Sequence, residues 1–401
     1  MKRLFVVAMC LAVSMGAWAQ RGAKKEAAEP EGYRFTDVKT VGVTPVKNQS
    51  SSGTCWAFSG VAFLESEVLR NGGPEVDLSE MFIVRHTYFD KAVKYVRMHG
   101  ALNFGQGGAT HDVMNVVREY GIVPEEVYTG LNYGTDLHRH GELDAVLTAY
   151  VNAVVKNPNR TLTTAWKEGI NGILDAYLGP LPEKFTYKGK EYTPKSYAES
   201  LGLDMDDYVS FTSYTHHPFY SQFAIEVPDN WAYGLSYNVP LEELEALFEQ
   251  TVEQGYSIYW ATDVSERGFS RQLAMAVVPE ADVQSMDDTE AARWGKLTEA
   301  EKEAELYKFD KPGKEKAVTQ QMRQEAYDNY QTTDDHGMQI VGTAVDQAGN
   351  KYYKVKNSWG ETGPYAGYYY FSYPFVYYKT MNMVVNKNAV PAALREKCGI
   401  R

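Results

Sequence analysis

Four side chains in this sequence have the types and the settings that thiol chemistry requires. Cys55 follows a glycine turn in "NQSSSGTCWAFSG", at the start of an apolar helical pattern. A thiolate that attacks a carbonyl needs an imidazole partner, a group that orients the imidazole, and donors for the developing oxyanion. His336 in "DDHGMQIVGTA", Asn357 in "YKVKNSWG" and Gln49, six residues before Cys55, are the candidates for these roles. The sequence therefore predicts a nucleophilic Cys–His–Asn site, with Gln49 and the Cys55 N–H as oxyanion donors.

Cys55 also has less reactive interpretations: a buried filler, half of a disulfide or a metal ligand. Beyond the first 20 residues the chain holds only Cys55 and Cys398, so one bridge between them is the alternative to two free thiols. We expect no bridge between them. The fold then does not rest on disulfides, and Cys55 is a free thiol. The unpaired N–H groups and the dipole at a helix start favour an anion, which predicts a lowered thiol pKa.

The helices that must position Cys55 are visible as apolar periodicity. Residues 55–69 carry apolar side chains at helical spacing and end at Gly72-Gly73-Pro74. A second helix begins at Ser79, and a third follows the glycine-rich turn 105–108 and closes at Gly121. A further helix leads into a strand within "YNVPLEELEALFEQTVEQGYSIYWATDV". A charge-rich helical stretch follows, with a capping box between Thr298 and Glu301.

A hairpin must bring His336 and Asn357 together. "MQIVGTAVDQAGNKYYKVKNSWG" alternates apolar and polar residues on both sides of a turn at Asp346–Asn350. The two strands would place Asn357 beside the His336 ring, where Trp359 could cover their hydrogen bond and exclude water. Because helices dominate the first part and antiparallel strands the last, the predicted fold class is α+β.

The N-terminal residues and the charge limit where the protein acts and what it binds. "MKRLFVVAMCLAVSMGAWAQ" has a basic start, a short apolar run and a small-x-small site after Ala19, so residues 1–19 read as a signal peptide. We expect an exported, periplasmic or secreted protein with no membrane span. A net charge of −12 argues against nucleic acid as a partner. The pairs His138/His140 and His216/His217 are weak metal signals, and we expect no metal and no cofactor.

Three segments, taken together, resemble the signature motifs of papain-like cysteine peptidases: "PVKNQSSSGTCWAFSG", "DDHGMQIVG" and "VKNSWG". The resemblance implies a two-subdomain fold with a helical half and an antiparallel β half. It implies Cys55 as nucleophile, His336 as acid and base, Asn357 as the group that orients it and Gln49 as oxyanion donor. "GQGGATHDVMNVVREYG" resembles the segment that binds the substrate backbone, which implies Gly107 and Gly108 as substrate-binding residues of the cleft. Trp359 is expected as a third substrate-binding residue.

Two departures from ordinary secreted members point to one branch of this family. The position three residues before the nucleophile, usually a structural cysteine, is Ser52. His336 follows Cys55 by 281 residues, against roughly 130–150 in papain and cathepsins. Both features, with "YAESLGLDMDDYVSFTSY", "SYNVPLEELEAL" and "VVNK", resemble bleomycin hydrolase and aminopeptidase C. The resemblance implies a peptidase domain over 33–388, with a mostly helical insertion around 130–215 and a charged helical segment around 285–333. A flexible leader (20–32) precedes it and a C-terminal tail (389–401) follows.

Members of that branch are typically cytosolic hexamers whose C-terminal tail captures the substrate amino terminus in the cleft. The resemblance therefore implies peptide substrates, N-terminal trimming and a homo-oligomer, possible here as a hexamer. This sequence departs in its signal peptide, in Asp335 before the histidine and in its ending "AVPAALREKCGIR". If the carboxylate of Arg401 lies outside the cleft, endopeptidase activity is the alternative. A non-catalytic peptide-binding relative is a further alternative.

Overall fold

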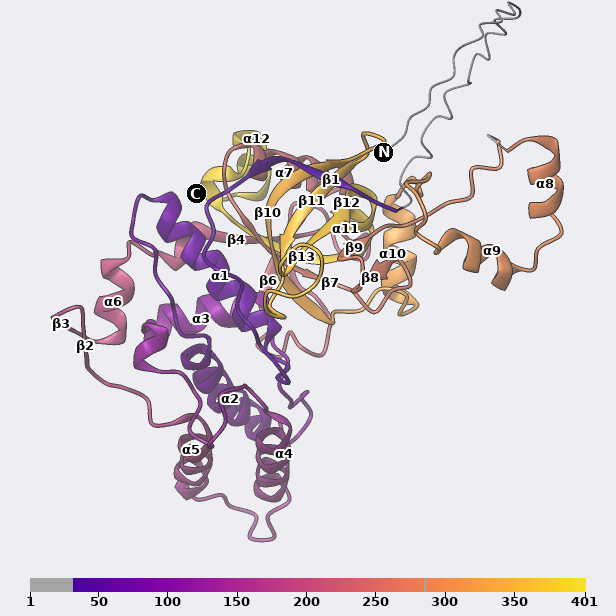
Figure 1. Cartoon of the computed structure of the whole chain (residues 1–401). Helices are drawn as coiled ribbons and strands as arrows, with labels where there is room; N and C mark the ends of the chain where they lie inside the picture. Colours follow the sequence, from indigo (N-terminus) through magenta and orange to yellow (C-terminus); the bar gives the residue numbers. More distant parts are fainter. Residues whose placement is uncertain (1–31, 285) are drawn as a thin grey trace, which may run out of the picture.

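A helical half and a sheet half lie side by side, with helix α1 (Cys55–Arg70) running between them (Figure 1). The computed structural model describes residues 32–284 and 286–401. The predicted signal peptide (1–19) and all but the last residue of the leader (20–32) lie outside the described residues. Every residue of α1 from Trp56 to Val68 is buried, as expected for a helix covered on both sides.

The helical half is built on α1, α2 (Glu80–Arg97) and α3 (Thr110–Tyr120). Ser79 caps α2 by accepting the N–H of Phe82 at 3.0 Å, and Gly121 ends α3 with a φ of 89°. Both helix boundaries agree with the sequence. The rest of this half consists of α4 (Gly141–Val155), α5 (Ala165–Leu178), the hairpin β2 (Phe185–Tyr187) and β3 (Lys190–Tyr192), α6 (Pro194–Ser200), and the 3-10 turns Glu125–Val127 and Met205–Asp207.

The sheet half is one eleven-stranded sheet in the order β5-β6-β4-β13-β7-β10-β11-β12-β9-β8, with β1 also paired to β10. Most pairs are antiparallel, but β4–β6 and β12–β9 are parallel. The predicted α+β class is confirmed, but the sheet is mixed rather than wholly antiparallel, because these two short pairs run parallel. The strands are β1 (Phe35–Thr40), β4 (Tyr208–Thr212), β5 (Gln222–Ala224), β6 (Leu235–Asn238), β7 (Ile258–Thr262), β8 (Phe269–Ser270), β9 (Met275–Ala276), β10 (His336–Asp346), β11 (Lys351–Lys356), β12 (Tyr368–Ser372) and β13 (Thr380–Asn386).

The predicted hairpin is confirmed as β10 and β11. Gln339 pairs with Lys356 near the open end, and the turn is closed by Asp346 N–H on the Asn350 carbonyl at 3.0 Å. Gly349 in this turn has a φ of 87°, a conformation that suits glycine. The hairpin thus begins at His336 and ends one residue before Asn357.

The remaining helices cover or extend the sheet half. They are α7 (Leu241–Glu253), α8 (Asp288–Trp294), α9 (Glu299–Leu306), α10 (Gln320–Asp328), α11 (Tyr373–Lys379), the 3-10 turn Lys387–Ala389 and α12 (Ala392–Cys398). The predicted capping box of Thr298 and Glu301 begins α9. α8 and α9 have no buried residues and project away from the sheet (Figure 1). Among the described residues, no helix is long and apolar enough to cross a bilayer.

Two glycines allow α1 to approach the sheet closely. A Cβ on Gly60 would lie 2.8 Å from the Tyr259 ring, and a Cβ on Gly337 would lie 2.7 Å from Ser59 Oγ. Gln339 of β10 also donates to Ser66 Oγ of α1 at 2.8 Å. The start of β10, and with it His336, is therefore held against the first turn of α1.

Candidate active site

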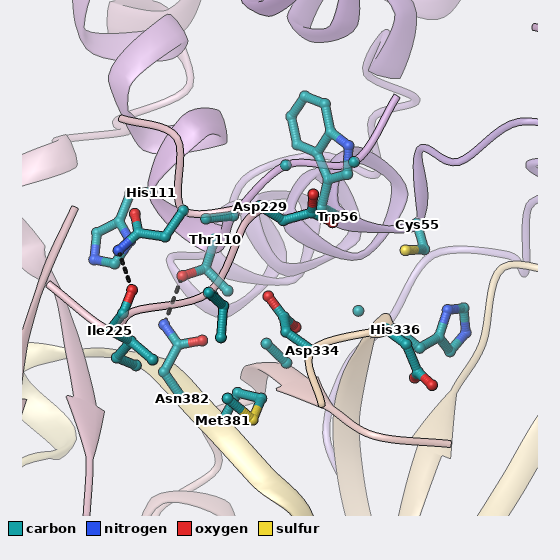
Figure 2. Close-up of a pocket in the computed structure, with 18 of the residues that line it drawn as sticks. Cys55, Trp56, Thr110, His111, Ile225, Asp229, Asp334, His336, Met381 and Asn382 are labelled. Carbon is teal, nitrogen blue, oxygen red and sulfur yellow. Dashed lines mark hydrogen bonds between the residues drawn. The ribbon is translucent and has the colours of Figure 1, made fainter. Parts of the chain in front are cut away.

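Cys55 and His336 line the same cavity, which has a volume of about 250 Å³. Cys55 is the first residue of α1, and His336 is the first residue of β10, on the opposite wall of the cavity (Figure 2). Among the described residues no hydrogen bond joins the sulfur to the imidazole. The structure therefore brings the two predicted residues together in one cleft.

Asn357 orients the His336 ring. His336 Nε2 lies 2.9 Å from Asn357 Oδ1, and the Ser358 backbone N–H donates to the same oxygen at 2.7 Å. Because a backbone N–H can only donate, the atom that it contacts is the amide oxygen, so Nε2 must carry a proton. In a neutral imidazole this leaves Nδ1 as the free acceptor. Ser358 was not predicted as a site residue, although it lies inside the "NSWG" motif.

Trp359 covers the His336 ring. The two rings stack with centroids 4.7 Å apart and planes 27° apart, and the Arg271 guanidinium lies 4.8 Å from the Trp359 ring centroid. Trp359 does not line the Cys55 cavity. In this structure it therefore contacts the imidazole as an aromatic cover.

Gln49 is tied into the loop before Cys55. Its Nε2 donates to the Ser52 carbonyl at 2.8 Å, and its Oε1 accepts from Ser358 Oγ at 2.6 Å. Gln49 is buried and does not line the cavity, and one of its two amide hydrogens has no acceptor among the described residues. The Cys55 N–H at the start of α1 likewise has no acceptor in the described part of the chain. Both candidate oxyanion donors thus keep an unused N–H.

Ser52 fixes this loop where ordinary secreted members carry a cysteine. Its hydroxyl donates to the Gln49 carbonyl at 2.7 Å and contacts Thr54 Oγ1 at 2.5 Å. Both remaining cysteines are free thiols, as expected. Hydrogen bonds, in place of a disulfide, hold the turn between Gln49 and Cys55.

A buried ion cluster supports the segment that leads to Gln49. Lys47 Nζ donates to Glu65 at 3.0 Å and to Glu80 at 2.7 Å, and it also pairs with Asp77 at 2.7 Å. These three attractions raise the pKa of Lys47, although burial alone would lower it. The cluster joins α1, α2 and the loop that precedes Gln49 into one unit.

The expected lowering of the Cys55 thiol pKa is not found in this structure. Burial, joined by the charge of Asp334, raises the pKa of Cys55 to about 12, while backbone groups of Gly337 and Trp56 act to lower it. Burial also lowers the pKa of His336 to about 4, against a smaller rise from its bond to Asn357. Burial, the largest cause in both cases, favours the neutral form of each group.

The glycine-rich loop forms the wall beside Cys55. A Cβ on Gly107 would overlap the Asp229 carboxylate, and one on Gly108 would lie 2.7 Å from the Trp56 indole. Trp56 Nε1 donates to the Gln106 carbonyl at 3.0 Å, and Lys91 donates to the carbonyls of Gly105 and Gly107. Gly107 and Gly108 both line the cavity. Asp229 was not singled out in the sequence, because it reaches the cleft from a loop 174 residues after Cys55.

The two aspartates before His336 have different surroundings. Asp335 accepts the N–H groups of Val264 and Ser265 at 2.9 and 3.0 Å, so its carboxylate holds the loop after β7. Asp334 also lines the cavity, and no hydrogen bond or ion pair to it exists among the described residues. Asp335 lines the cavity as well. Asp334 was not predicted as a site residue, since nothing in "TTDDHG" distinguishes the two carboxylates.

The C-terminal tail packs outside the cleft. Leu394 and Cys398 of α12 are buried against the sheet half, with Lys397 paired to Glu243 of α7. None of residues 387–401 lines the cavity. In this structure the tail therefore supplies no group to the site.

The histidine pairs of the sequence have neighbours of their own. His216 and His217 contact the two oxygens of the Glu226 carboxylate at 3.1 and 3.0 Å. His138 and His140 lie in the helical half, and burial lowers the pKa of each to about 4. None of the four lines the Cys55 cavity.

Two segments of the chain match known protein families. Residues 30–171 match the family described as papain family cysteine protease, and residues 273–399 match the peptidase C1-like family. Together the two segments span about two thirds of the chain.

Curated relatives align over nearly the whole chain. Cysteine proteinase 1, mitochondrial, from Saccharomyces cerevisiae is 23% identical over 90% of this chain and 79% of its own length. Aminopeptidase C from Lactococcus lactis is 22% identical over 88% of this chain and 84% of its own length.

The crystal structure of pepW from Lactobacillus rhamnosis has a similar fold. It superposes with a TM-score of 0.67 at 18% identity, over 91% of this chain and 84% of that chain. Two segments of the chain thus match papain-type cysteine peptidase families, and the chain is similar to aminopeptidase C over nearly its whole length.

Proposed function

We propose that this protein is an exported aminopeptidase that hydrolyses peptide bonds with Cys55 as nucleophile, His336 as acid and base, Asn357 as the orienting group and Gln49 as an oxyanion donor. The observation that carries the proposal is the cleft itself. It holds Cys55, with an unused N–H at the start of α1, opposite an imidazole whose proton is placed on Nε2 by Asn357.

The first half of the reaction follows from this arrangement. His336 Nδ1 accepts the thiol proton as the sulfur attacks the substrate carbonyl, because Nε2 already carries its own proton. The negative charge on the carbonyl oxygen is met by the Cys55 N–H and the free amide hydrogen of Gln49. His336 then gives its proton from Nδ1 to the leaving amine, and a thioester remains on Cys55.

The second half reverses the proton transfers. A water molecule enters the place of the amine and loses its proton to His336 Nδ1 as it attacks the thioester. The proton returns to the sulfur as the carboxylic acid leaves. Asn357 and Trp359 keep the ring in one plane through both halves, since each contacts the ring away from Nδ1. These steps need no cofactor.

The preference for a free amino terminus rests on the relatives named aminopeptidase C. The test compares leucine 7-amido-4-methylcoumarin with its N-acetylated form, using wild type and Cys55→Ala. We expect cleavage of the free-amine substrate by wild type alone. Turnover by Cys55→Ala would refute the assignment of the nucleophile, and faster cleavage of the acetylated form would refute the aminopeptidase assignment.

An endopeptidase with the same site is the second candidate. One observation favours it: the C-terminal tail packs on α7 and leaves the cavity open. A peptide that extends in both directions could then pass through the cleft. Cleavage of an internally quenched peptide blocked at both ends would support this candidate.

Export and assembly stay predictions from the sequence and the family resemblance. Export predicts that the mature protein begins at Gln20, which N-terminal sequencing of material from the cell envelope or culture fluid would check.

Assembly as a homo-oligomer, with a hexamer as the family precedent, predicts a native mass several times the chain mass of 45.1 kDa. Light scattering measures it.

A further inference from the structure

The cavity beside Cys55 has an acidic wall. Asp229 and Asp334 both line it, from the loop before β6 and the loop before β10. Figure 2 shows Asp334 reaching into the middle of the cavity from below and Asp229 facing it from the glycine-rich side. No lysine or arginine lines the cavity. Both carboxylates therefore face a space that contains no positive side chain.

The negative charges of Asp229 and Asp334 are not equally balanced by neighbouring donors and cations. Burial raises the pKa of Asp229, but the Lys91 ammonium behind the glycine-rich loop and a 2.9 Å hydrogen bond from Asn103 act in the opposite direction. Asp334 has no hydrogen bond or ion pair among the described residues, and the charges that act on it come from Asp229, Asp335 and Asp263. Asp334 is thus the carboxylate for which the chain provides no positive partner.

A third acceptor, an amide oxygen, faces the same cavity. Asn382 of β13 is only 6% exposed and lines the cavity. Its amide nitrogen donates to Thr110 Oγ1 at 2.7 Å and to Ser210 Oγ at 2.8 Å, which fixes its orientation. Its carbonyl oxygen has no donor among the described residues and points away from Thr110, toward the cavity (Figure 2). A buried amide oxygen held in this way marks a place for a donor from a ligand.

We propose that Asp334, Asp229 and Asn382 form a subsite for a positively charged group of the substrate, on the amino-terminal side of the bond that Cys55 attacks. The group is an ammonium or guanidinium ion, from the free amino terminus or from a lysine or arginine side chain. The inference rests on the proposed peptidase reaction and names the residues that would select its substrates.

Electrostatics support this assignment. Burial, and then the neighbouring charges of Asp229, Asp335 and Asp263, raise the pKa of Asp334 to about 8. A bound cation would offset these repulsions and would favour the ionised form of Asp334. It would also offset the effect of Asp334 on Cys55, whose thiol pKa the Asp334 charge raises. Substrate binding would then assist ionisation of the nucleophile.

The test uses four fluorogenic substrates and the full-length protein. Leucine and acetyl-leucine coumarylamides vary the terminal amine. Acetyl-Lys-Leu and acetyl-Nle-Leu coumarylamides vary the side-chain charge at constant length, because norleucine lacks only the ammonium group. We expect wild type to prefer the charged member of at least one pair by about tenfold in kcat/KM, as for a hydrogen-bonded ion. Preference in the first pair identifies the terminal amine, and preference in the second identifies the side chain.

Variants then assign the preference to its residues. Asp334→Asn and Asp229→Asn remove a charge at nearly constant shape, and Asp136→Asn is the matched control at an exposed site without a partner among the described residues. We expect the ratio of charged to neutral substrate to fall in Asp334→Asn and, less, in Asp229→Asn, and to stay at the wild-type value in Asp136→Asn. Circular dichroism melts show that each variant is folded.

Failure of this inference differs from failure of the proposed function. Wild-type cleavage without charge preference in either pair, or a preference unchanged in Asp334→Asn, would overturn the cation subsite and leave the Cys55 reaction intact. Activity that survives in Cys55→Ala would overturn the proposed reaction instead. Since wild type alone gives the first comparison, the inference can be tested even if a variant fails to fold.

Discussion

His336 begins the β10–β11 hairpin, Asn357 directly follows it, and a single hydrogen bond of 2.9 Å joins their side chains. In the proposed mechanism, the bond determines which ring nitrogen exchanges a proton with Cys55. Asn357→Ala should lower kcat about 10- to 100-fold with little change in KM, because the ring loses its orientation but the cleft keeps its shape. Asn388→Ala, at an exposed site, is the control. Wild-type kcat in Asn357→Ala would show that the bond has no catalytic consequence.

Gln49→Ala should lower kcat about 100-fold or more, as expected for loss of one oxyanion donor. Ser358→Ala should have a smaller effect of the same kind, because Ser358 Oγ holds the Gln49 amide by a 2.6 Å bond. Ser358→Thr, which keeps the hydroxyl, should restore most of the rate. Steady-state kinetics at saturating substrate measure all three. An unchanged kcat in Gln49→Ala would leave the Cys55 N–H as the oxyanion donor that the structure offers.

Lys47→Met should destabilise the fold by about 3–5 kcal/mol, because it leaves buried carboxylates without their cation. The side chains of Glu65 and Glu80 are 0% and 3% exposed, so water cannot replace Lys47 there. Urea titration followed by fluorescence measures the free energy of unfolding. Lys39→Met, at a partly exposed pair with Glu253, should change it by less than about 1 kcal/mol. Equal losses in both variants would contradict the role of the buried cluster.

Asp334→Asn should change stability in a pH-dependent way. The unfolded chain releases this proton near the ordinary aspartate pKa of 3.8, whereas the folded chain holds it to about pH 8. The ionisable carboxyl therefore destabilises the folded state increasingly as the pH rises between these values. The melting temperature of Asp334→Asn relative to wild type should be higher at pH 8.5 than at pH 5. A difference that is constant with pH would show that Asp334 titrates normally.

The sequence was informative wherever a local pattern carries the information. The α1 start at Cys55, the Ser79 cap, the Gly121 end and the β10–β11 turn follow from periodicity and turn residues, and the confirmed hairpin brings His336 to Asn357. The parallel strand pairs were missed because short edge strands leave no period. Asp229 and Asn382 were missed because loops or strands far along the chain bring them to Cys55. The thiol pKa was misjudged because burial, which no short motif reveals, raises it.

The most direct test of the central claim compares the two free cysteines. Turnover of leucine 7-amido-4-methylcoumarin should be lost in Cys55→Ser and retained in Cys398→Ser, with equal amounts of folded protein by circular dichroism. Iodoacetamide that inactivates wild type should modify Cys55, as identified by peptide mass spectrometry. Turnover by Cys55→Ser at the wild-type rate, or inactivation with Cys55 unmodified, would contradict the account.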